Sequence, residues 1–248
     1  MKHLRAVFRF VLLLSFTFGI YGIWLILRFF IPNKLFWRQL ILEWWAKGFV
    51  RIAHIDIEII GSPPKAPFFL VSNHVGYIDI PVIRSAAKGI FVAKHEIKGW
   101  LCVGRMIRNM GTIYVDRSVK RDIPRAGGEV IEALGRGEGV IVFPEGTSTK
   151  GETVLPFNSS FLAFAAKTDI PVSYVSISYR TPNGEPPPSE CICWWDDTPL
   201  LNHMLRLLSL RRFTAILNFG DETVVDADRK QLAAELRERV KKSFIPMM

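Results

Sequence analysis

The sequence predicts an α/β fold: a mixed, mainly buried sheet flanked by helices and preceded by an N-terminal membrane-associated helical module. Short apolar runs typical of buried strands alternate with segments of helical periodicity along most of the chain. A long uncharged segment precedes them, and 49% of the 248 residues are hydrophobic, enough for one large core. We therefore expect an N-terminal membrane-anchoring helical module over residues 1–60 and an α/β domain over residues 61–248.

The N-terminal module contains 18 consecutive residues without a charge, residues 10–27. In a helix they would extend about 27 Å, nearly the hydrocarbon thickness of a bilayer. A cleaved signal peptide is the competing interpretation, but the stretch is longer than a usual signal core and no small-x-small cleavage site follows it. A second aromatic-rich segment covers residues 35–50, so a hairpin in one leaflet and a single full span both stay open. Basic residues that favour the cytoplasmic face flank the first segment on both sides: Lys2, Arg5, Arg9, Arg28, Lys34 and Arg38.

The rest of the chain alternates strand-like and helix-like segments. We expect strands at residues 68–72, 90–93, 112–115, 140–143, 172–179 and 214–219, and we assign residues 55–60, a short apolar-polar alternation, to the N-terminal module. We expect helices at residues 80–87, 121–136, 159–168, 200–210 and 228–244. The last helix is the best supported, because Leu232, Leu236 and Val240 share one face and its charges match the helix dipole. The proline-rich segment 181–189 is expected to be a surface loop.

The composition is both basic and hydrophobic, with 32 lysines and arginines against 23 aspartates and glutamates and a formal net charge of +9. Such a chain suits anionic membrane lipids, acidic carrier proteins and phosphate-bearing substrates. Nucleic acid is not an expected partner, because no DNA- or RNA-binding signature accompanies the charge. Cys102, Cys191 and Cys193 cannot build a disulfide framework and lack the histidines of a metal site, so we expect reduced thiols, no metal and a cytoplasm-facing domain.

An Asn-His pair follows the apolar run 67–70, where a buried strand is expected to end. Gly76 allows a tight turn, and Asp79 lies five residues after His74, where the next helix is expected to begin. The turn can therefore bring the Asp79 carboxylate onto the His74 imidazole, the arrangement of a general base and the group that orients it. The alternative is a core histidine whose hydrogen bonds are simply satisfied by a carboxylate.

Three further clusters lie beside predicted strands, where α/β proteins commonly gather functional residues. The segment 111–117 ends in Asp116 and Arg117, and an arginine there can donate two hydrogen bonds to a phosphate or a carboxylate. The segment 142–150 holds a proline and glycine turn with a carboxylate, hydroxyls and a lysine. The third cluster, at residues 170–172, starts a strand. Taken singly, these clusters are typical of a structural ion pair, an ordinary loop and plain core.

As an ordered set, these clusters carry a resemblance to a known family. Asn73-His74-x-x-x-x-Asp79, Tyr114-Val115-Asp116-Arg117, Pro144-Glu145-Gly146-Thr147 and Ile170-Pro171-Val172 resemble the glycerolipid acyltransferase family that includes 1-acylglycerol-3-phosphate acyltransferases. The similarity covers residues 67–219, and the membrane module is similar too. It implies a membrane-bound lysolipid O-acyltransferase that moves a fatty acyl group from an acyl thioester to a free hydroxyl, converting 1-acylglycerol-3-phosphate (lysophosphatidate) to phosphatidic acid. It implies no cofactor, with acyl-CoA or acyl-acyl carrier protein as co-substrate.

The resemblance also implies a role for each matching residue. His74 would be the general base on the lysolipid hydroxyl, and Asp79 would hold its tautomer and stabilise the imidazolium. The hydroxyl would then attack the thioester directly, without an acyl-enzyme. The other implied residues bind the acceptor: Arg117 takes its anionic head group, Glu145, Gly146 and Thr147 position it, and Asn73 orders the turn or donates to the developing oxyanion.

One residue departs from the family pattern. The arginine that usually follows Glu-Gly-Thr is Ser148 here, and Lys150 supplies only a point charge in its place. Another lysolipid, such as a lyso-ornithine lipid or a lysophospholipid with a larger head group, therefore competes with lysophosphatidate as the acceptor. A different class of function, a non-catalytic lipid-binding membrane protein, is the remaining alternative. We expect the catalytic domain on the cytoplasmic face of a membrane, which for this sequence is expected to be a bacterial inner membrane.

Two further segments suggest partners. Between residues 94 and 125 there are eight basic residues, a surface suited to an acidic acyl carrier protein, to the phosphates of acyl-CoA or to anionic lipid. The apolar segment 200–210 is interpreted as either a second membrane-contacting helix or a buried core helix. The remaining histidines have no partner pattern and are left out of the chemistry: His3, His54, His95 and His203.

Overall fold

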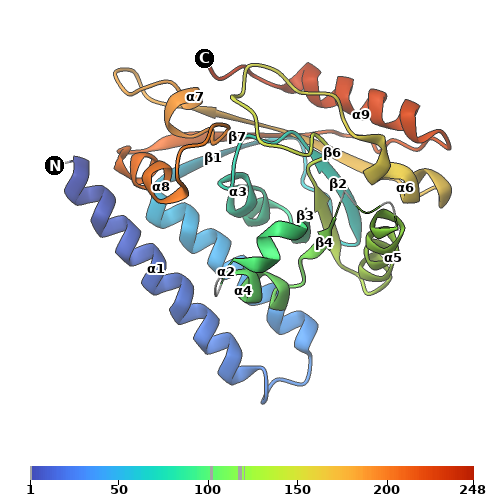
Figure 1. Ribbon diagram of the computed structural model, residues 1–248, viewed down its shortest axis with the longest axis horizontal. Helices are drawn as coiled ribbons and strands as arrows, with labels where there is room; N and C mark the ends of the chain where they lie inside the picture. Colours follow the sequence, from blue (N-terminus) through green and yellow to red (C-terminus); the bar gives the residue numbers. More distant parts are fainter. Residues whose placement is uncertain (1, 101–102, 117–118, 120) are drawn as a thin grey trace.

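The computed structural model describes residues 2–100, 103–116, 119 and 121–248. Its helices are α1 Lys2–Leu27, α2 Lys34–Ala53, α3 Asp79–Ala86, the 3-10 helix η1 His95–Gly99, α4 Val103–Asn109, α5 Asp122–Gly135, the 3-10 helix η2 Ser159–Leu162, α6 Ala163–Lys167, α7 Pro188–Cys191, α8 Leu200–Ser209 and α9 Arg229–Ser243. Its strands are β1 Ile55–Ile60, β2 Phe68–Ser72, β3 Gly89–Lys94, β4 Ile113–Val115, β5 Gly139–Val142, β6 Val172–Arg180 and β7 Phe213–Phe219. Figure 1 shows these strands gathered in a central sheet with helices around it.

The strands form one mixed sheet in the order β1-β7-β6-β2-β5-β3-β4. The strands from β6 to β4 run parallel, whereas β1 and β7 run parallel to each other and antiparallel to β6. This arrangement confirms the predicted mixed sheet. β2 lies in its interior, and all five of its residues are buried. The loop that follows β2 therefore starts at the carboxyl edge of parallel strands, where sites of α/β proteins are usually found.

Helices cover both faces of the sheet and bury two hydrophobic clusters. On one face, Phe68 and Leu70 of β2 pack with residues of α2, α3 and α8. On the other face, Phe69 and Val71 pack with residues of α5, α6 and α9. The alternation follows from the geometry of a strand, whose successive side chains point to opposite faces. Because α3 covers the first face directly after β2, its N-terminus lies beside the loop that joins the two elements.

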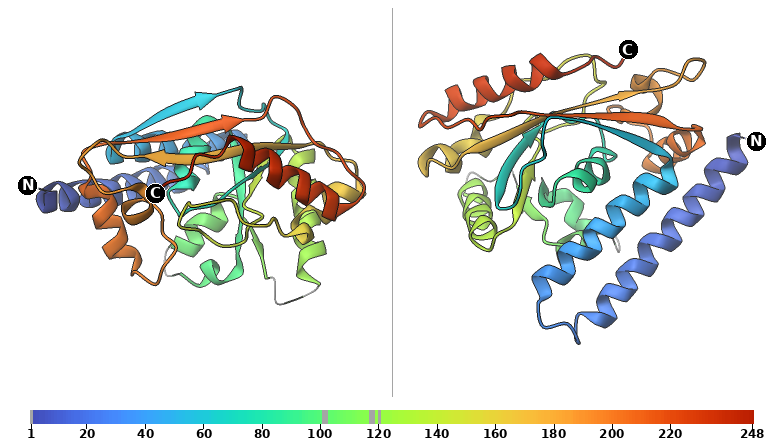
Figure 2. Two further views of the ribbon diagram at one scale, coloured as in Figure 1. Left: turned by 90° about the horizontal axis from the view of Figure 1, so that it is seen from above. Right: turned by 180° about the vertical axis from the view of Figure 1, so that it is seen from behind.

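The two N-terminal helices form an antiparallel hairpin, with α1 lying along both α2 and α8 (Figure 2). Among the described residues, α1 is the helix whose length and apolar composition would allow it to cross a membrane, and only 17% of its most apolar window is buried. Its outward side exposes a stripe of large apolar side chains that includes Leu4, Phe8, Val11, Phe18 and Ile26. The hairpin therefore presents to the exterior the kind of surface that a lipid bilayer covers.

Two arginines fasten the start of α1 to the end of α8. Arg9 is 6% exposed, and its guanidinium donates to the carbonyl oxygens of Leu210 at 2.5 Å and Arg211 at 3.1 Å. Arg5 donates to the carbonyl oxygen of Ser209 at 3.0 Å. The last carbonyls of a helix lack partners within the helix and carry its negative dipole end, so cationic donors satisfy them well. These contacts hold α1 against the α/β part of the chain.

The structure departs from the sequence-based elements in three places. Ile55–Ile60, which was expected to belong to the N-terminal module, is an edge strand of the sheet and pairs with β7. The helical segments η1 and α4 were not expected, because glycines and lysines interrupt any apolar periodicity there. The prediction that residues 181–189 form a surface loop is wrong at the end of this segment. Pro188 and Ser189 are buried at the start of α7. The Ser189 N–H donates to the carbonyl oxygen of Met247 at 3.1 Å. For segment 200–210 the core interpretation holds on one face of α8, where His203, Leu207 and Leu208 are buried.

Candidate active site

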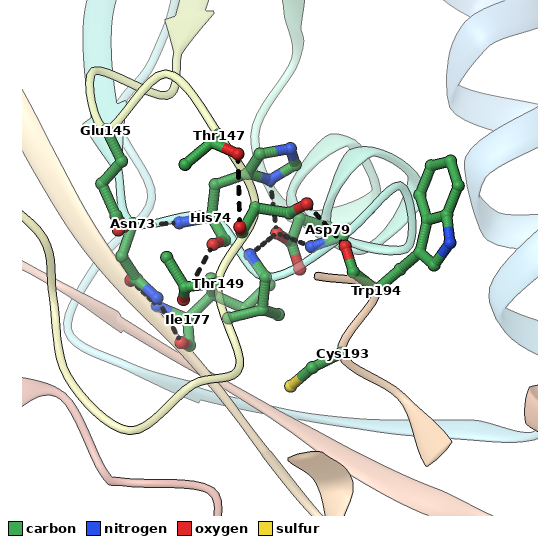
Figure 3. Close-up of polar contacts among 12 residues, drawn as sticks. Asn73, His74, Asp79, Glu145, Thr147, Thr149, Ile177, Cys193 and Trp194 are labelled. Atoms are coloured by element: carbon green, nitrogen blue, oxygen red, sulfur yellow. Dashed lines mark hydrogen bonds and ion pairs between the residues drawn. The ribbon is translucent and has the colours of Figure 1, made fainter. Parts of the chain in front are cut away.

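The loop between β2 and α3 brings His74 and Asp79 together. The turn closes through hydrogen bonds from the Asp79 N–H to the Gly76 carbonyl oxygen at 3.1 Å and from the Ile80 N–H to the Tyr77 carbonyl oxygen at 3.3 Å. Asp79 is the first residue of α3, so its side chain folds back over the loop. His74 Nδ1 lies 2.7 Å from Asp79 Oδ2 (Figure 3), the contact that the spacing of these two residues led us to expect.

Four donors surround the Asp79 carboxylate, whose side chain has no solvent exposure. Oδ2 accepts hydrogen bonds from the Val75 N–H at 2.7 Å and the Gly76 N–H at 3.2 Å in addition to the imidazole, and Oδ1 accepts from the Tyr179 hydroxyl at 2.8 Å. Burial, and secondly the charge of Asp79, raises the pKa of Tyr179 well above its ordinary value, so the phenol remains a donor. Both oxygens of the Asp79 carboxylate are therefore used as hydrogen-bond acceptors inside the protein.

This environment determines how the imidazole of His74 is held. Since Asp79 Oδ2 acts as the acceptor of this contact, Nδ1 of the imidazole carries the proton and Nε2 carries the lone pair. Among the described residues no hydrogen bond occupies Nε2, and 20% of the side chain is exposed. The ring of Phe143 stacks on the imidazole, with centroids 4.1 Å apart and an interplanar angle of 17°. Asp79 and Phe143 thus fix the orientation of the imidazole, and the general-base role expected for His74 from the sequence stays a prediction.

Glu145 supports the main chain at His74. Its Oε1 accepts a hydrogen bond from the His74 N–H at 2.8 Å, and its Oε2 accepts one from the Leu155 N–H at 3.1 Å. Burial raises the pKa of Glu145 to about 7, although both backbone donors act in the opposite direction. Both carboxylate oxygens are therefore used inside the protein, where they tie the loop after β5 to the loop after β2. The substrate-binding role expected from the sequence stays a prediction.

Asn73 is 1% exposed and hydrogen-bonded to β6 in both directions. Its Nδ2 donates to the Ile177 carbonyl oxygen at 2.9 Å, and its Oδ1 accepts from the Ile177 N–H at 2.8 Å. The side chain thus behaves like one more residue of the sheet and holds the start of the loop in place. Ordering the turn is the first of the two roles that the sequence suggested for it.

The remaining predicted site residues lie along the loop after β5, apart from Arg117, which lies outside the described residues. Gly146 has φ +77°, a conformation that favours glycine, and its N–H donates to the Phe143 carbonyl oxygen at 3.1 Å. Thr147 is exposed, whereas the Lys150 ammonium pairs with Glu152 at 3.0 Å. The Ser148 hydroxyl donates to the Trp194 carbonyl oxygen at 2.5 Å. Ser148, which stands where the family usually has an arginine, therefore binds the segment that follows α7.

The site also contains residues that the sequence reasoning did not identify. Tyr179 comes from β6 and Trp194 follows α7, both more than a hundred positions after His74. Phe143 stands directly before the Pro-Glu-Gly-Thr block, and this adjacency was the only signal in the sequence for any of the three. Tyr179 and Trp194 carried no local pattern, because their contacts with the site depend on how distant elements pack.

A cysteine lies near the site without serving as a nucleophile. Burial raises the pKa of the Cys193 thiol far above its ordinary value, and the negative charge of Asp79 raises it further. Cys193 is 3% exposed and therefore stays protonated, whereas nucleophilic cysteines react as thiolates in accessible, electropositive surroundings. The arrangement fits a base that activates an external hydroxyl better than one that activates a nucleophile of the protein.

Known proteins resemble this chain in sequence and in structure. A family model described as Acyltransferase matches residues 54–178. A lyso-ornithine lipid O-acyltransferase of Pseudomonas aeruginosa is 29% identical over 208 residues, which cover 82% of this chain and 78% of that protein. A 1-acyl-sn-glycerol-3-phosphate acyltransferase of Neisseria gonorrhoeae is 28% identical over 200 residues, 80% of this chain and 76% of that protein. The crystal structure of the 1-acyl-sn-glycerophosphate acyltransferase PlsC from Thermotoga maritima matches with a TM-score of 0.69 and 27% identity, covering 97% of this chain and 96% of that one.

Proposed function

This chain belongs to the acyltransferase family, and we propose that it transfers a fatty acyl group from an acyl thioester to a lysolipid hydroxyl. His74 is the general base of the proposed reaction. The relatives described above are named as acyltransferases of lysolipids, which supports this acceptor. The observation that carries the proposal is the 2.7 Å contact between His74 Nδ1 and the buried Asp79, which leaves Nε2 as the base. The family assignment agrees with the resemblance found in the sequence.

The reaction transfers one proton and exchanges one bond. Nε2 of His74 takes the proton from the lysolipid hydroxyl as its oxygen attacks the thioester carbonyl carbon. The tetrahedral intermediate collapses with cleavage of the carbon–sulfur bond, and the imidazolium returns the proton to the leaving thiolate. Asp79 stabilises the imidazolium that exists between these two steps. The products are an ester and a free thiol, and no covalent bond to the protein forms.

The donor is proposed to be acyl-CoA or an acyl carrier protein. Six of the eight basic residues predicted to attract an acidic donor are described, and all six are exposed around η1 and α4 or at α5: Lys94, Lys98, Arg105, Arg108, Arg121 and Arg125. Arg125 also pairs with Asp122, at 2.6 Å between Nε and Oδ1, and Arg117 and Lys120 lie outside the described residues. A positive surface of this kind raises the encounter rate with a phosphate-bearing or acidic partner.

The wild-type protein tests the proposal directly. Purified in detergent and mixed with acyl-CoA or acyl carrier protein as donor, it is expected to acylate a lysolipid, with the diacyl product measured by mass spectrometry. A non-catalytic lipid-binding protein would bind the same lysolipids and release no free thiol. Absence of ester formation with every donor and acceptor pair would remove acyl transfer as the function.

We further propose that the helical hairpin binds one leaflet of a membrane, with the α/β part on the cytoplasmic side. The support is that α1 lies along α2 and α8 rather than projecting away from the protein, and that Arg5 and Arg9 hold its first turns on α8. A helix that is apolar on one side and covered by protein on the other suits an oblique position in one leaflet. This position would bring lysolipids to the active site from the surface on which they reside.

A charged stripe on α1 is expected to release the protein from membranes. The variant carrying Phe8→Glu, Val11→Glu and Phe18→Glu alters side chains that are 65%, 55% and 49% exposed. Burying such a side chain in an apolar phase is worth about 1.5–3 kcal/mol, so the loss of three predicts at least about 100-fold weaker binding. Binding is measured by sedimentation with vesicles of phosphatidylglycerol and phosphatidylethanolamine.

A matched control carries three glutamates elsewhere. Ile59, Ile131 and Val225 are 46%, 41% and 51% exposed, and they lie on β1, on α5 and between β7 and α9. Ile59→Glu, Ile131→Glu and Val225→Glu change the net charge by the same amount and are expected to leave vesicle binding within about threefold, because surface charges act over short distances in salt. Equal losses in both variants would show that net charge, not the apolar stripe of α1, drives membrane binding.

A further inference from the structure

A cavity of about 310 Å³ lies between the loop after β5, α7 and α8. It has no role in the reaction proposed above. It is lined by residues of both charges, an aromatic ring and a buried histidine, among them Lys150, Glu190, Trp195, Asp196, His203 and Arg206. The volume suits a small polar group rather than an acyl chain or a whole lipid.

The walls of the cavity are bonded to the catalytic loop. Lys150 follows Thr149, whose N–H donates to the His74 carbonyl oxygen at 3.0 Å. Trp195 follows Trp194, whose N–H donates to the Val75 carbonyl oxygen at 2.7 Å. A group held in this cavity therefore lies beside the chain segments that are hydrogen-bonded to the catalytic loop.

The buried histidine of the cavity wall connects it to the same loop. His203 is 1% exposed, its Nε2 donates to the Cys193 carbonyl oxygen at 3.1 Å, and its Nδ1 accepts from the Tyr77 hydroxyl at 3.1 Å. Burial lowers the pKa of His203, which agrees with this neutral tautomer. His203 therefore adds shape and a fixed contact to Tyr77, and the charges of the cavity come from its other residues.

The charged groups of the cavity are balanced. Lys150, whose ammonium also pairs with Glu152 at 3.0 Å, and Arg206 contribute two cations to the lining, and Glu190 and Asp196 contribute two anions. The Lys150 ammonium lies 5.7 Å from the centroid of the Trp195 ring, a face that attracts cations. A ligand with one anionic and one ammonium group can pair with both kinds of charge here, whereas a phosphate monoester would meet two carboxylates without a cation of its own.

We propose that this cavity receives the head group of the lysolipid and favours heads that carry an anionic group together with a primary ammonium. The inference rests on the acyl transfer proposed above and names the class of acceptor. It agrees with Ser148, which replaces the arginine expected to grip a phosphate and which hydrogen-bonds the wall segment at Trp194 instead. A lyso-ornithine lipid offers a carboxylate and an ammonium, and lysophosphatidylethanolamine offers a phosphodiester and an ammonium, so both present the same chemistry.

The test removes the two negative charges of the cavity without changing its size. In the variant carrying Glu190→Gln and Asp196→Asn, the amide oxygen of residue 196 can still accept from the Thr198 N–H, a hydrogen bond of 3.1 Å that Asp196 accepts now. The expected result is a fall of at least about tenfold in kcat/KM for lyso-ornithine lipid or lysophosphatidylethanolamine, because the ammonium of the head group loses its charged hydrogen-bond partners. For lysophosphatidate and lysophosphatidylglycerol, kcat/KM is expected to stay constant or rise, which also shows that the variant is folded.

A control with the same charge change lies outside the cavity. Asp197 and Glu222 are exposed, and neither lines the cavity. Asp197→Asn with Glu222→Gln is expected to leave all four acceptors unaffected. A response of only one of the two ammonium-bearing acceptors would support the inference and identify the head group. The inference would be overturned if the cavity variant lost kcat/KM equally for all four acceptors. It would also be overturned if the wild type acylated lysophosphatidate alone and the cavity variant did the same. Both results would leave acyl transfer intact. Failure of the wild type with every acceptor would instead remove both.

Discussion

Replacement of His74 by alanine is expected to lower kcat for acyl transfer by at least about a thousandfold, because loss of a general base typically costs 10²–10⁴. The fold should survive, since Asp79 keeps the Val75, Gly76 and Tyr179 donors after the imidazole is removed. The partly exposed position of His74 also means that little core is lost. The measurement is single-turnover ester formation at saturating lysolipid, with circular dichroism and vesicle binding to show that the variant is intact.

His95→Ala is the matched control for this variant. His95 is exposed in η1, and no interaction of its side chain with the site is present among the described residues. The control is expected to retain wild-type kcat. Turnover of the His74 variant within about tenfold of the wild type would exclude His74 as the base and would require another acceptor for the proton of the hydroxyl.

Asp79→Asn is expected to reduce kcat by up to about 10⁴, the effect that loss of the orienting carboxylate has in hydrolases with a comparable pair. An asparagine has nearly the same shape, and its oxygen can replace Oδ2 as the acceptor for the Val75 and Gly76 N–H groups. The negative charge that stabilises the imidazolium is lost, so the effect should fall on kcat, with KM for both substrates nearly unchanged. Steady-state kinetics separates the two parameters.

Tyr179→Phe is expected to lower kcat for the same reason as Asp79→Asn, but by a smaller factor. It removes the hydroxyl that donates to Asp79 Oδ1 at 2.8 Å but leaves the carboxylate and the imidazole in contact. One hydrogen bond to a charged group is worth about 1.5–3 kcal/mol at most, so we expect a fall in kcat of about tenfold, well short of the Asp79 variant. Full activity in the folded Asp79→Asn protein would show that the carboxylate only stabilises the loop and has no part in the chemistry.

The strands were the most predictable part of the fold. The expected bounds of β2 agree with the structure at both ends, and those of β6 and β7 differ by a single residue. Interior strands are buried on both faces and leave an unbroken apolar run that flanking turn residues delimit. The segment 95–109 was missed because its short helices lie at the surface and bury little, so that no periodicity is required of their sequence.

By itself the sequence determined the pair at the centre of the site and the family of the chain. His74 and Asp79 are five residues apart across one turn, so local backbone geometry suffices to bring their side chains together. Only the tertiary structure decided what surrounds them: Tyr179 on the carboxylate, the Glu145 carboxylate under the His74 main chain, and the cavity walled by Lys150 and Arg206. These contacts join residues separated by roughly 55 to 130 positions, and such distances are closed by the burial of whole helices and strands against one another, which no local spacing records.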